Sequence, residues 1–281
     1  MSLPLSVQDI FRARQRIAPY VWHTPLRQAT AISRAAGAAV FLKLENWQPT
    51  GSFKVRGAVN FLCPHPPAPS PEAKRHASGE GEQAHPPAPS PVGTGEGEQI
   101  VTASAGNHAL AVGYAARCWG WTRGTVFVPT TAPRAKVEKL RGFPLEVREV
   151  GLTYDDAHHA AEEFQRATGA TFVHAYDDPR TVAGAGTLGL EILEDLPDVD
   201  AILVPVGGGG MSAGIAIAVK MLAPRVKFFG VNRRLRLLCA IRCAITSATR
   251  NTRRDRRSRM GWQAGLAKSA LRSRKSLWTT W

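Results

Sequence analysis

One lysine lies among small and apolar residues where a helix could begin, in the segment Gly51-Ser52-Phe53-Lys54-Val55-Arg56-Gly57. An ordinary lysine has a pKa of about 10.4, so its amine is a poor nucleophile at neutral pH. Desolvation or a nearby cation lowers that pKa, and the freed amine can then form a Schiff base with an aldehyde cofactor such as pyridoxal phosphate. Taken alone, the segment is equally compatible with a solvated lysine at a helix start.

A second segment, residues 101–109, has the sequence Val-Thr-Ala-Ser-Ala-Gly-Asn-His-Ala and places small residues and hydroxyls at an expected strand-to-helix junction. Free backbone N–H groups and the helix dipole attract a carboxylate at such a junction. This arrangement would suit an amino-acid substrate. The alternative is an ordinary helix start with Ser104 or Asn107 as its N-cap.

A third segment contains four consecutive glycines, Gly207 to Gly210, between a buried apolar run and a helical pattern that starts near Met211. Glycines allow close approach of a ligand, and the bare backbone can wrap a phosphate with several N–H donors. A dinucleotide site is one alternative, but the G-x-G-x-x-G spacing is absent and the segment comes late in the chain. A flexible turn is the other alternative.

The elements that must position these three segments alternate between strands and helices along the chain. Continuous apolar strands that alternate with helices predict an α/β fold with parallel sheets covered on both faces. The expected strands are residues 39–44, 99–103, 124–129, 145–150, 171–174, 201–206 and 226–231, and the expected helices are residues 53–62, 107–118, 133–140, 154–168, 181–193 and 211–222.

Composition favours a globular protein, because 44% of the 281 residues are hydrophobic. The longest uncharged run, residues 201–219, is broken by Pro205 and the glycines, so it predicts a strand, a loop and a helix instead of a membrane span. The four cysteines form no CxxC pair, so neither a metal site nor a disulfide framework is expected. With no secretory signal pattern, the sequence predicts a cytoplasmic protein.

Residues 64–98 differ in composition from the rest of the chain. The heptapeptide HPPAPSP occurs at residues 65–71 and again at 85–91, and GEGEQ occurs at 79–83 and 95–99. Such sequences bury too little apolar surface to offset the entropy of ordering, so we expect a disordered insertion. A Pro-rich ligand for a partner domain is the alternative.

The net charge of +14 is concentrated at the end of the chain. Residues 232–281 hold 12 Arg and 2 Lys against one acidic residue, whereas the other 231 residues carry 22 basic and 21 acidic side chains. A basic tail could bind nucleic acid or an acidic membrane. The abrupt change within an expected strand-loop-helix unit favours instead a foreign or out-of-frame segment, so no specific nucleic-acid or membrane partner is expected.

In this order, the three segments resemble the serine/threonine dehydratase (threonine ammonia-lyase) group of fold type II pyridoxal-phosphate enzymes, which also includes serine racemases. The resemblance covers roughly residues 5–62 and 99–231. Further motifs that carry it are Thr24-Pro25-Leu26, Lys43-Leu44-Glu45-Asn46, Asp177-Asp178-Pro179, Gly186-Thr187-Leu188-Gly189-Leu190-Glu191 and Pro205-Val206 before the glycines.

The resemblance implies a role for each motif. Lys54 would hold the cofactor as a Schiff base and later take the substrate's Cα proton, and Phe53 would pack beside the cofactor ring. Asn107 would bind the phenolic oxygen of the cofactor. The substrate carboxylate would be held by Ser104, Ala105, Gly106 and His108, and the cofactor phosphate by Gly207, Gly208, Gly209, Gly210 and Met211.

The resemblance also implies a tryptophan-synthase-β-like fold of two open parallel-sheet, three-layer domains. Residues 1–55 and 150–231 would form the large cofactor domain, and residues 56–149 the small domain. Family members continue after this point with an acidic residue, a cation site and further strands, but here Asn232 and the unrelated basic tail follow. We therefore expect the C-terminal part of the large domain to be missing, through truncation or a frameshift.

The implied activity is deamination of L-threonine, L-serine or both to a 2-oxo acid and ammonia. Racemases of this group carry a serine where Ala105 stands, and an alanine has no proton to give, so the lyase is favoured over a racemase. Phe53 points away from the cysteine-synthase branch. A catalytically inactive remnant and a serine-racemase-like enzyme remain as alternatives, and the family implies a homo-oligomer acting on a small amino acid.

Overall fold

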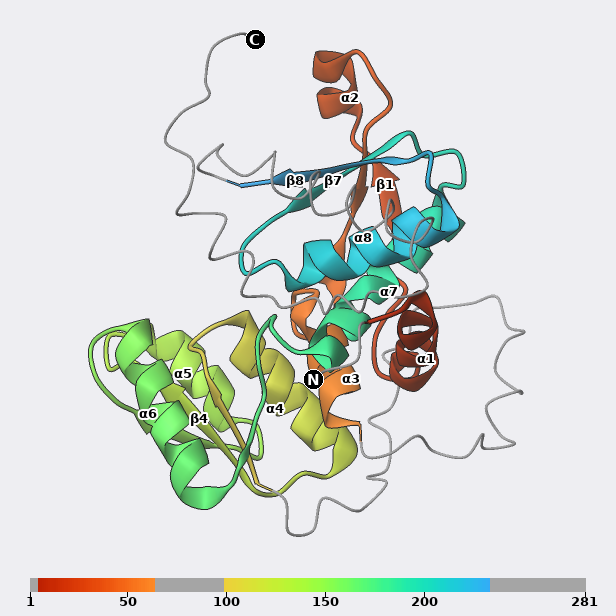
Figure 1. Ribbon diagram of the computed structural model, residues 1–281. Coiled ribbons are helices and arrows are strands. Elements are labelled where there is room, and N and C mark those ends of the chain that lie inside the picture. The colour runs from red at the N-terminus through yellow and green to blue at the C-terminus, as the bar shows by residue number, and fades with distance from the viewer. Residues whose placement is uncertain (1–4, 64–98, 233–281) are drawn as a thin grey trace, which may run out of the picture. The chain divides into compact units, whose positions relative to one another are not determined.

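The computed structural model describes residues 5–63 and 99–232 and shows a mixed α/β protein (Figure 1). The expected insertion at 64–98 and nearly all of the basic tail lie outside the described residues. The described residues fall into two compact units, one within residues 12–175 and one within residues 5–11 and 176–232. The earlier assignment of large and small domains stays a prediction.

The elements follow one another in an order close to the one expected from the sequence. They are α1 (Val7–Ile17), β1 (Leu26–Gln28), α2 (Thr30–Ala36), β2 (Phe41–Lys43), η1 (Glu45–Trp47), α3 (Lys54–Leu62), β3 (Ile100–Ala103), α4 (Asn107–Trp119), β4 (Gly124–Val128), α5 (Arg134–Arg141), β5 (Glu146–Glu149), α6 (Tyr154–Thr168), β6 (Thr171–Phe172), α7 (Pro179–Asp195), β7 (Ala201–Pro205), α8 (Gly210–Leu222) and β8 (Lys227–Val231).

The unit of residues 12–175 is built on a four-stranded sheet with the order β5-β4-β3-β6. All strand pairs of this four-stranded sheet are parallel, and Thr102 of β3 lies opposite Val126 of β4. Every residue of β3 and β4 is buried, as their continuous apolar sequences require. The prediction of an α/β fold with parallel sheets is confirmed.

Helices cover both faces of β4, because alternate residues of a strand point to opposite sides. Phe127 packs with Ala157 and Ala161 of α6, whereas Val126 and Val128 pack in a cluster with residues of α4 and α5. Figure 1 shows α6 and α4 on either side of this strand. The core therefore fixes the carboxyl end of β3, where the loop containing Asn107 begins.

The expected strand at residues 39–44 is present, but its pairing departs from the parallel pattern. β2 pairs antiparallel with β1, with Leu26 opposite Lys43 and Gln28 opposite Phe41. Antiparallel strands do not need a crossover helix, and this pair encloses only the short helix α2. Hydrophobic pattern alone did not distinguish this pairing from a parallel one.

The other unit combines the parallel pair β7–β8 with α7 and α8. The two helices approach closely at glycines: a Cβ on Gly214 would lie 2.7 Å from the Gly186 nitrogen, and a Cβ on Gly189 would lie 2.9 Å from the Ala218 side chain. Ile10 of α1 joins Leu190 and Ala218 in the buried cluster of this unit.

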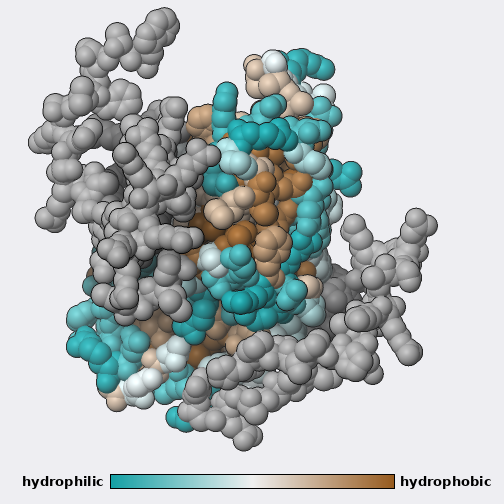
Figure 2. All heavy atoms as spheres, turned by 45° about the vertical axis from the view of Figure 1, so that its right-hand side comes forward, coloured by the Kyte–Doolittle hydropathy of each residue, from teal (hydrophilic) through white to brown (hydrophobic). Residues whose placement is uncertain are grey.

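Some apolar surface of this second unit remains exposed in the described part of the chain. On the β7–β8 pair, Leu203 and its neighbour Phe229 are 67% and 40% exposed. Hydrophobic side chains gather on one face of the molecule, between hydrophilic ones (Figure 2). No helix among residues 5–63 and 99–232 is both long enough and apolar enough to cross a membrane.

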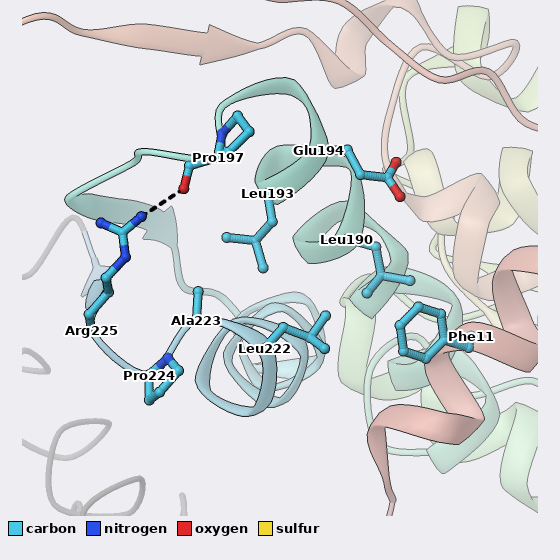
Figure 3. Close-up of a pocket in the computed structure, with 9 residues that line it drawn as sticks. All are labelled: Phe11, Leu190, Leu193, Glu194, Pro197, Leu222, Ala223, Pro224 and Arg225. Atoms are coloured by element: carbon cyan, nitrogen blue, oxygen red, sulfur yellow. Dashed lines mark hydrogen bonds between the residues drawn. The ribbon is translucent and has the colours of Figure 1, made fainter.

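A groove of about 560 Å³ lies beside α7 and α8, and its lining is mostly apolar (Figure 3). Arg225 closes one end by donating a hydrogen bond to the Pro197 carbonyl at 2.9 Å. The groove contains none of the site residues expected from the sequence. Its other lining residues are Phe11, Leu190, Leu193, Glu194, Leu222, Ala223 and Pro224.

Candidate active site

Lys54 is the first residue of α3, and its side chain is largely shielded from solvent. Its Nζ atom donates a hydrogen bond to the Ala175 carbonyl oxygen at 2.7 Å and lies 5.3 Å from the centre of the Phe53 ring. Burial lowers the pKa of Lys54, because a desolvated ammonium is less stable than a solvated one. The amine is therefore closer to its nucleophilic form than an exposed lysine would be.

Two hydroxyls just before Lys54 are buried without a partner in the described part of the chain. Thr50 Oγ1 and Ser52 Oγ make no hydrogen bond there, and Ser52 is only 7% exposed. Leaving a buried polar atom unpaired costs roughly 1–3 kcal/mol, so such atoms call for an explanation. A polar ligand that binds these hydroxyls is one such explanation.

The segment that follows β3 opens helix α4, as the sequence predicted. The N-cap residue is Gly106 and no side chain caps the helix, so the alternative with Ser104 or Asn107 as N-cap is wrong. Asn107 is exposed at the first helical position. Amides in the first turn of a helix have no intrahelical acceptor, so those of Asn107 and His108 are suited to an anion.

Ser104 is held by two hydrogen bonds that leave its hydroxyl proton free to donate. Its N–H donates to the Phe127 carbonyl at 3.1 Å, and its Oγ accepts from the Gly106 N–H at 3.2 Å. The Gly106 amide is thus already used within the loop. The groups best placed to hold a carboxylate are therefore the Ser104 hydroxyl and the neighbouring amides.

The imidazole of His108 has a role that the sequence did not predict. It is buried, and its Nε2 lies 2.9 Å from the Val173 carbonyl, so Nε2 must carry the proton and donate. Burial first of all, and then the charges of Lys54 and His174, lower the pKa of His108 to about 4, against the opposing effect of the hydrogen bond to Val173. His108 is therefore a neutral donor at physiological pH.

The short segment Val173–Ala175 connects the Asn107 loop to Lys54. The Val173 carbonyl accepts hydrogen bonds from Thr102 Oγ1 at 3.0 Å and from His108, and the Ala175 carbonyl accepts from Lys54. The structure therefore brings Lys54 and the residues around Asn107 to one segment. Nothing in the side chains of Val173 or Ala175 identifies this role, since only their backbone carbonyls act.

The tetraglycine segment belongs to the other unit and follows β7, and its last glycine, Gly210, is the first residue of α8. Gly209 has a φ of 95° and is the N-cap of α8, whose first helical hydrogen bond runs from Ala213 to Gly209. A Cβ on Gly207 or Gly209 would meet nothing within 4 Å, whereas one on Gly208 would clash with the Tyr176 ring. A helix start with open space before it can accept a phosphate.

The predicted site residues are divided between the two units. Lys54, Phe53 and residues 104–108 belong to the unit of residues 12–175, and residues 207–211 to the other. Among residues 5–63 and 99–232 no group of three or more His, Cys, Asp and Glu side chains is arranged to hold a metal ion. The individual roles of the site residues stay predictions.

Residues 17–258 match the family described as pyridoxal-phosphate dependent enzyme. The chain belongs to this family. The predicted cofactor, pyridoxal phosphate, is confirmed at the level of the family, and the match extends beyond β8 into the basic segment.

Relatives within the pyridoxal-phosphate family agree with the resemblance to threonine ammonia-lyases. The chain is 39% identical over 227 residues to an L-threonine ammonia-lyase of Thermotoga maritima, covering 81% of this chain and 50% of the relative. A similar match, 40% identical over 222 residues, is to the L-threonine ammonia-lyase of Geobacter sulfurreducens, covering 79% of this chain and 48% of the relative. The chain thus spans about half the length of these curated relatives.

Solved structures confirm the fold. Threonine deaminase isoform 2 from Solanum lycopersicum is similar with a TM-score of 0.65 and 30% identity, covering 82% of this chain and 58% of the solved one. Maize serine racemase is similar with a TM-score of 0.66 and 30% identity, covering 81% and 61%. The predicted fold type II architecture is confirmed by these similarities.

The residues present fit the cofactor of this family. A shielded lysine amine suits an aldehyde, and the open space at Gly207 and Gly209 beside the start of α8 suits a phosphate. The unpaired hydroxyls of Thr50 and Ser52, which precede Lys54 in the sequence, provide further polar groups.

Proposed function

We propose that this chain catalyses the pyridoxal-phosphate-dependent deamination of L-threonine, L-serine or both to a 2-oxo acid and ammonia. The observation that carries the proposal is the desolvated Lys54 amine, held 2.7 Å from the Ala175 carbonyl next to the Asn107 loop. The named relatives support the choice of reaction, because those from Thermotoga maritima and Geobacter sulfurreducens are called L-threonine ammonia-lyases.

In this proposal Lys54 has two tasks. Its Nζ atom would hold the cofactor aldehyde, and the same amine, once free, would take the Cα proton of the substrate. A lowered pKa serves both tasks, because the neutral amine is the nucleophile and the base. The bound cofactor supplies the electron sink for the carbanion that forms at Cα.

The residues of the Asn107 loop orient the substrate and the cofactor. The Ser104 hydroxyl and the amides of Ala105 and His108 hold the substrate carboxylate at the start of α4, and Asn107 binds the phenolic oxygen of the cofactor. The hydrogen bond from His108 to Val173 keeps the loop in place. The amides of residues 207–211 hold the phosphate, and Phe53 packs beside the ring.

Elimination is proposed instead of racemisation because the loop offers no proton donor at Ala105. Racemisation needs a group that returns a proton to the opposite face of Cα, and an alanine methyl cannot do so. Net loss of the Cα proton and the β-hydroxyl as one water, followed by hydrolysis with one water, would give the 2-oxo acid and ammonia.

The activity assay follows ammonia and 2-oxo acid from the full chain supplied with pyridoxal phosphate and L-threonine or L-serine. Release of both products in equal amounts, abolished in Lys54→Ala, is the expected result. Lys43→Ala is the matched control, because Lys43 also donates to a backbone carbonyl, that of Thr24 at 2.6 Å. A folded chain that interconverts the enantiomers of serine without forming a 2-oxo acid would contradict the proposal.

We also propose that the protein is cytoplasmic and forms a homo-oligomer, with no nucleic-acid or membrane partner. Support for the location comes from the cysteine pattern. The exposed apolar side chains of Leu203 and Phe229 support association with further protein surface. Light scattering of the full chain measures the oligomeric state.

A further inference from the structure

A buried ion pair lies close in sequence to Lys54 and is not used by the proposed chemistry. The side chain of Arg56 is fully buried, and Glu45 is 14% exposed. The guanidinium binds the carboxylate through two atoms, Nε to Oε2 at 2.8 Å and Nη2 to Oε1 at 2.8 Å. Two parallel bonds of this kind fix the relative orientation of both side chains.

Further hydrogen bonds extend this pair into a network. Glu45 Oε1 also accepts from Thr24 Oγ1 at 2.6 Å and from Gln48 Nε2 at 3.3 Å. Gln48 binds both backbone atoms of Trp22, accepting from its N–H at 3.0 Å and donating to its carbonyl at 2.7 Å. Burial alone would raise the pKa of Glu45, but the bonds and charge of Arg56 bring it below the usual value.

This network holds the chain on both sides of Lys54. Upstream, the Gln48 carbonyl accepts a hydrogen bond from the Gly51 N–H at 2.7 Å, which fixes the turn before the lysine. Downstream, Arg56 lies two residues after Lys54 in the first turn of α3. No side chain caps this helix, so its start lacks the usual local anchor.

We propose that the Glu45–Arg56 ion pair, together with Gln48, is the positioning device that holds the Lys54 amine in its shielded place against Ala175. The inference rests on the proposed function in taking Lys54 as the reactive amine. Buried ion pairs add little net stability compared with apolar residues, so a role in geometry explains this one better than a role in stability. Removing either partner would free the uncapped start of α3.

The test measures the reactivity of Lys54 in the cofactor-free full chain. The chain is labelled with an amine-acylating reagent over a range of pH, and mass spectrometry compares the Lys54 peptide with that of exposed Lys136. In the wild-type chain the midpoint for Lys54 lies below that of an ordinary lysine. In Glu45→Gln and Arg56→Lys it rises by about one pH unit, since the freed amine reaches solvent.

Trp121→Phe is the matched control for loss of stability. Trp121 is buried and donates from Nε1 to the Leu62 carbonyl at 3.1 Å, at the opposite end of α3. This variant should unfold at a lower temperature while the Lys54 midpoint stays at the wild-type value. Midpoints that are unchanged in folded Glu45→Gln and Arg56→Lys would overturn the proposal.

Gln48→Leu covers the case in which the ion-pair variants fail to fold. It leaves the Glu45–Arg56 pair and the backbone bond from Gly51 in place but removes the side-chain bonds that tie Gln48 to Trp22 and Glu45, so the Lys54 midpoint should rise here too. A folded Gln48→Leu chain with the wild-type midpoint would then overturn the proposal.

A parallel measurement separates this inference from the proposed function. The rate at which the visible absorbance of the lysine imine develops on adding pyridoxal phosphate should fall roughly tenfold in Arg56→Lys, a change worth about 1.4 kcal/mol. A wild-type chain that forms no imine, while the variants still shift the labelling midpoint, contradicts the function and supports the positioning role. Equal rates of imine formation and equal Lys54 labelling midpoints in all chains would contradict the positioning role but not the proposed function.

Discussion

The Nζ atom of Lys54 and the carbonyl oxygen of Ala175, which are 121 residues apart in the sequence, are joined by a hydrogen bond of 2.7 Å. Two residues earlier, the Val173 carbonyl accepts from His108. One short backbone segment therefore fixes both the Lys54 amine and the loop proposed to bind the substrate. Changes at this segment should affect the amine and the loop together.

The buried His108 imidazole predicts a pH dependence of stability. Its pKa is about 4 in the folded chain against 6.5 when unperturbed, so the unfolded chain binds more protons between these values. The stabilisation is complete above about pH 6.5 and is lost as the pH falls to about 4, an effect of roughly 3 kcal/mol. Urea unfolding at a series of pH values measures it.

His108→Gln tests this assignment, because glutamine can still donate to Val173 but does not titrate. Its free energy of unfolding should fall less steeply between pH 6.5 and 4 than that of the wild-type chain. His159→Gln is the control, since His159 is exposed and pairs with Glu163 on the surface. If the free energy of unfolding of His108→Gln falls with pH as steeply as that of the wild-type chain, His108 is not the source of the pH dependence.

Adjacent glycines in the segment proposed to bind the phosphate predict different effects of the same substitution. A Cβ on Gly207 would meet no atom within 4 Å, and the φ of Gly207 is not positive. The free energy of unfolding of Gly207→Ala should therefore equal or slightly exceed that of the wild-type chain. Gly208→Ala places a methyl group against the Tyr176 ring and should cost about 1–3 kcal/mol. Thermal and urea unfolding compare the two variants.

Gly207→Ala also tests phosphate binding. A methyl group at Gly207 would fill the space proposed for the phosphate, so pyridoxal phosphate should bind Gly207→Ala at least tenfold more weakly than the wild-type chain. Equilibrium dialysis gives the affinity without requiring activity. Wild-type affinity in the stable Gly207→Ala chain would show that the phosphate lies elsewhere.

The contact between α7 and α8 predicts a large effect at Gly214. A Cβ there would press on the Val182 carbonyl and lie 2.7 Å from the Gly186 nitrogen, both of which are backbone atoms. Gly214→Ala should therefore cost several kcal/mol, although alanine favours a helix by about 1 kcal/mol. Gly207→Ala serves as the control, and equal unfolding midpoints would contradict the close packing.

Most of the fold could be predicted from hydrophobic pattern. The expected helix at 154–168 has the observed bounds, and the expected strand at 226–231 is observed as β8, Lys227–Val231. Helix α1 was not predicted, although Ser6 and Asp9 form hydrogen bonds in both directions typical of a helix start. Strand β1 and helix α2 were not predicted either, because they are too short for periodicity to be decisive.

The site was predictable where residue type determines the chemistry. Lysine, asparagine and glycine carry recognisable functions, so the three segments could be found without a structure. The acceptors at Val173 and Ala175 could not, because every residue has the same carbonyl. The partners of Arg56 were also hidden, since its contact with Glu45 depends on how the loop around Gln48 folds back.

The most direct test of the central claim is to trap the cofactor on its lysine. The full chain is incubated with pyridoxal phosphate, reduced with borohydride, digested and analysed by mass spectrometry. The account predicts a covalent adduct on the Lys54 peptide of the wild-type and Lys43→Ala chains, and none in Lys54→Ala. A folded wild-type chain without an adduct at Lys54, or with its adduct at another lysine, would contradict it.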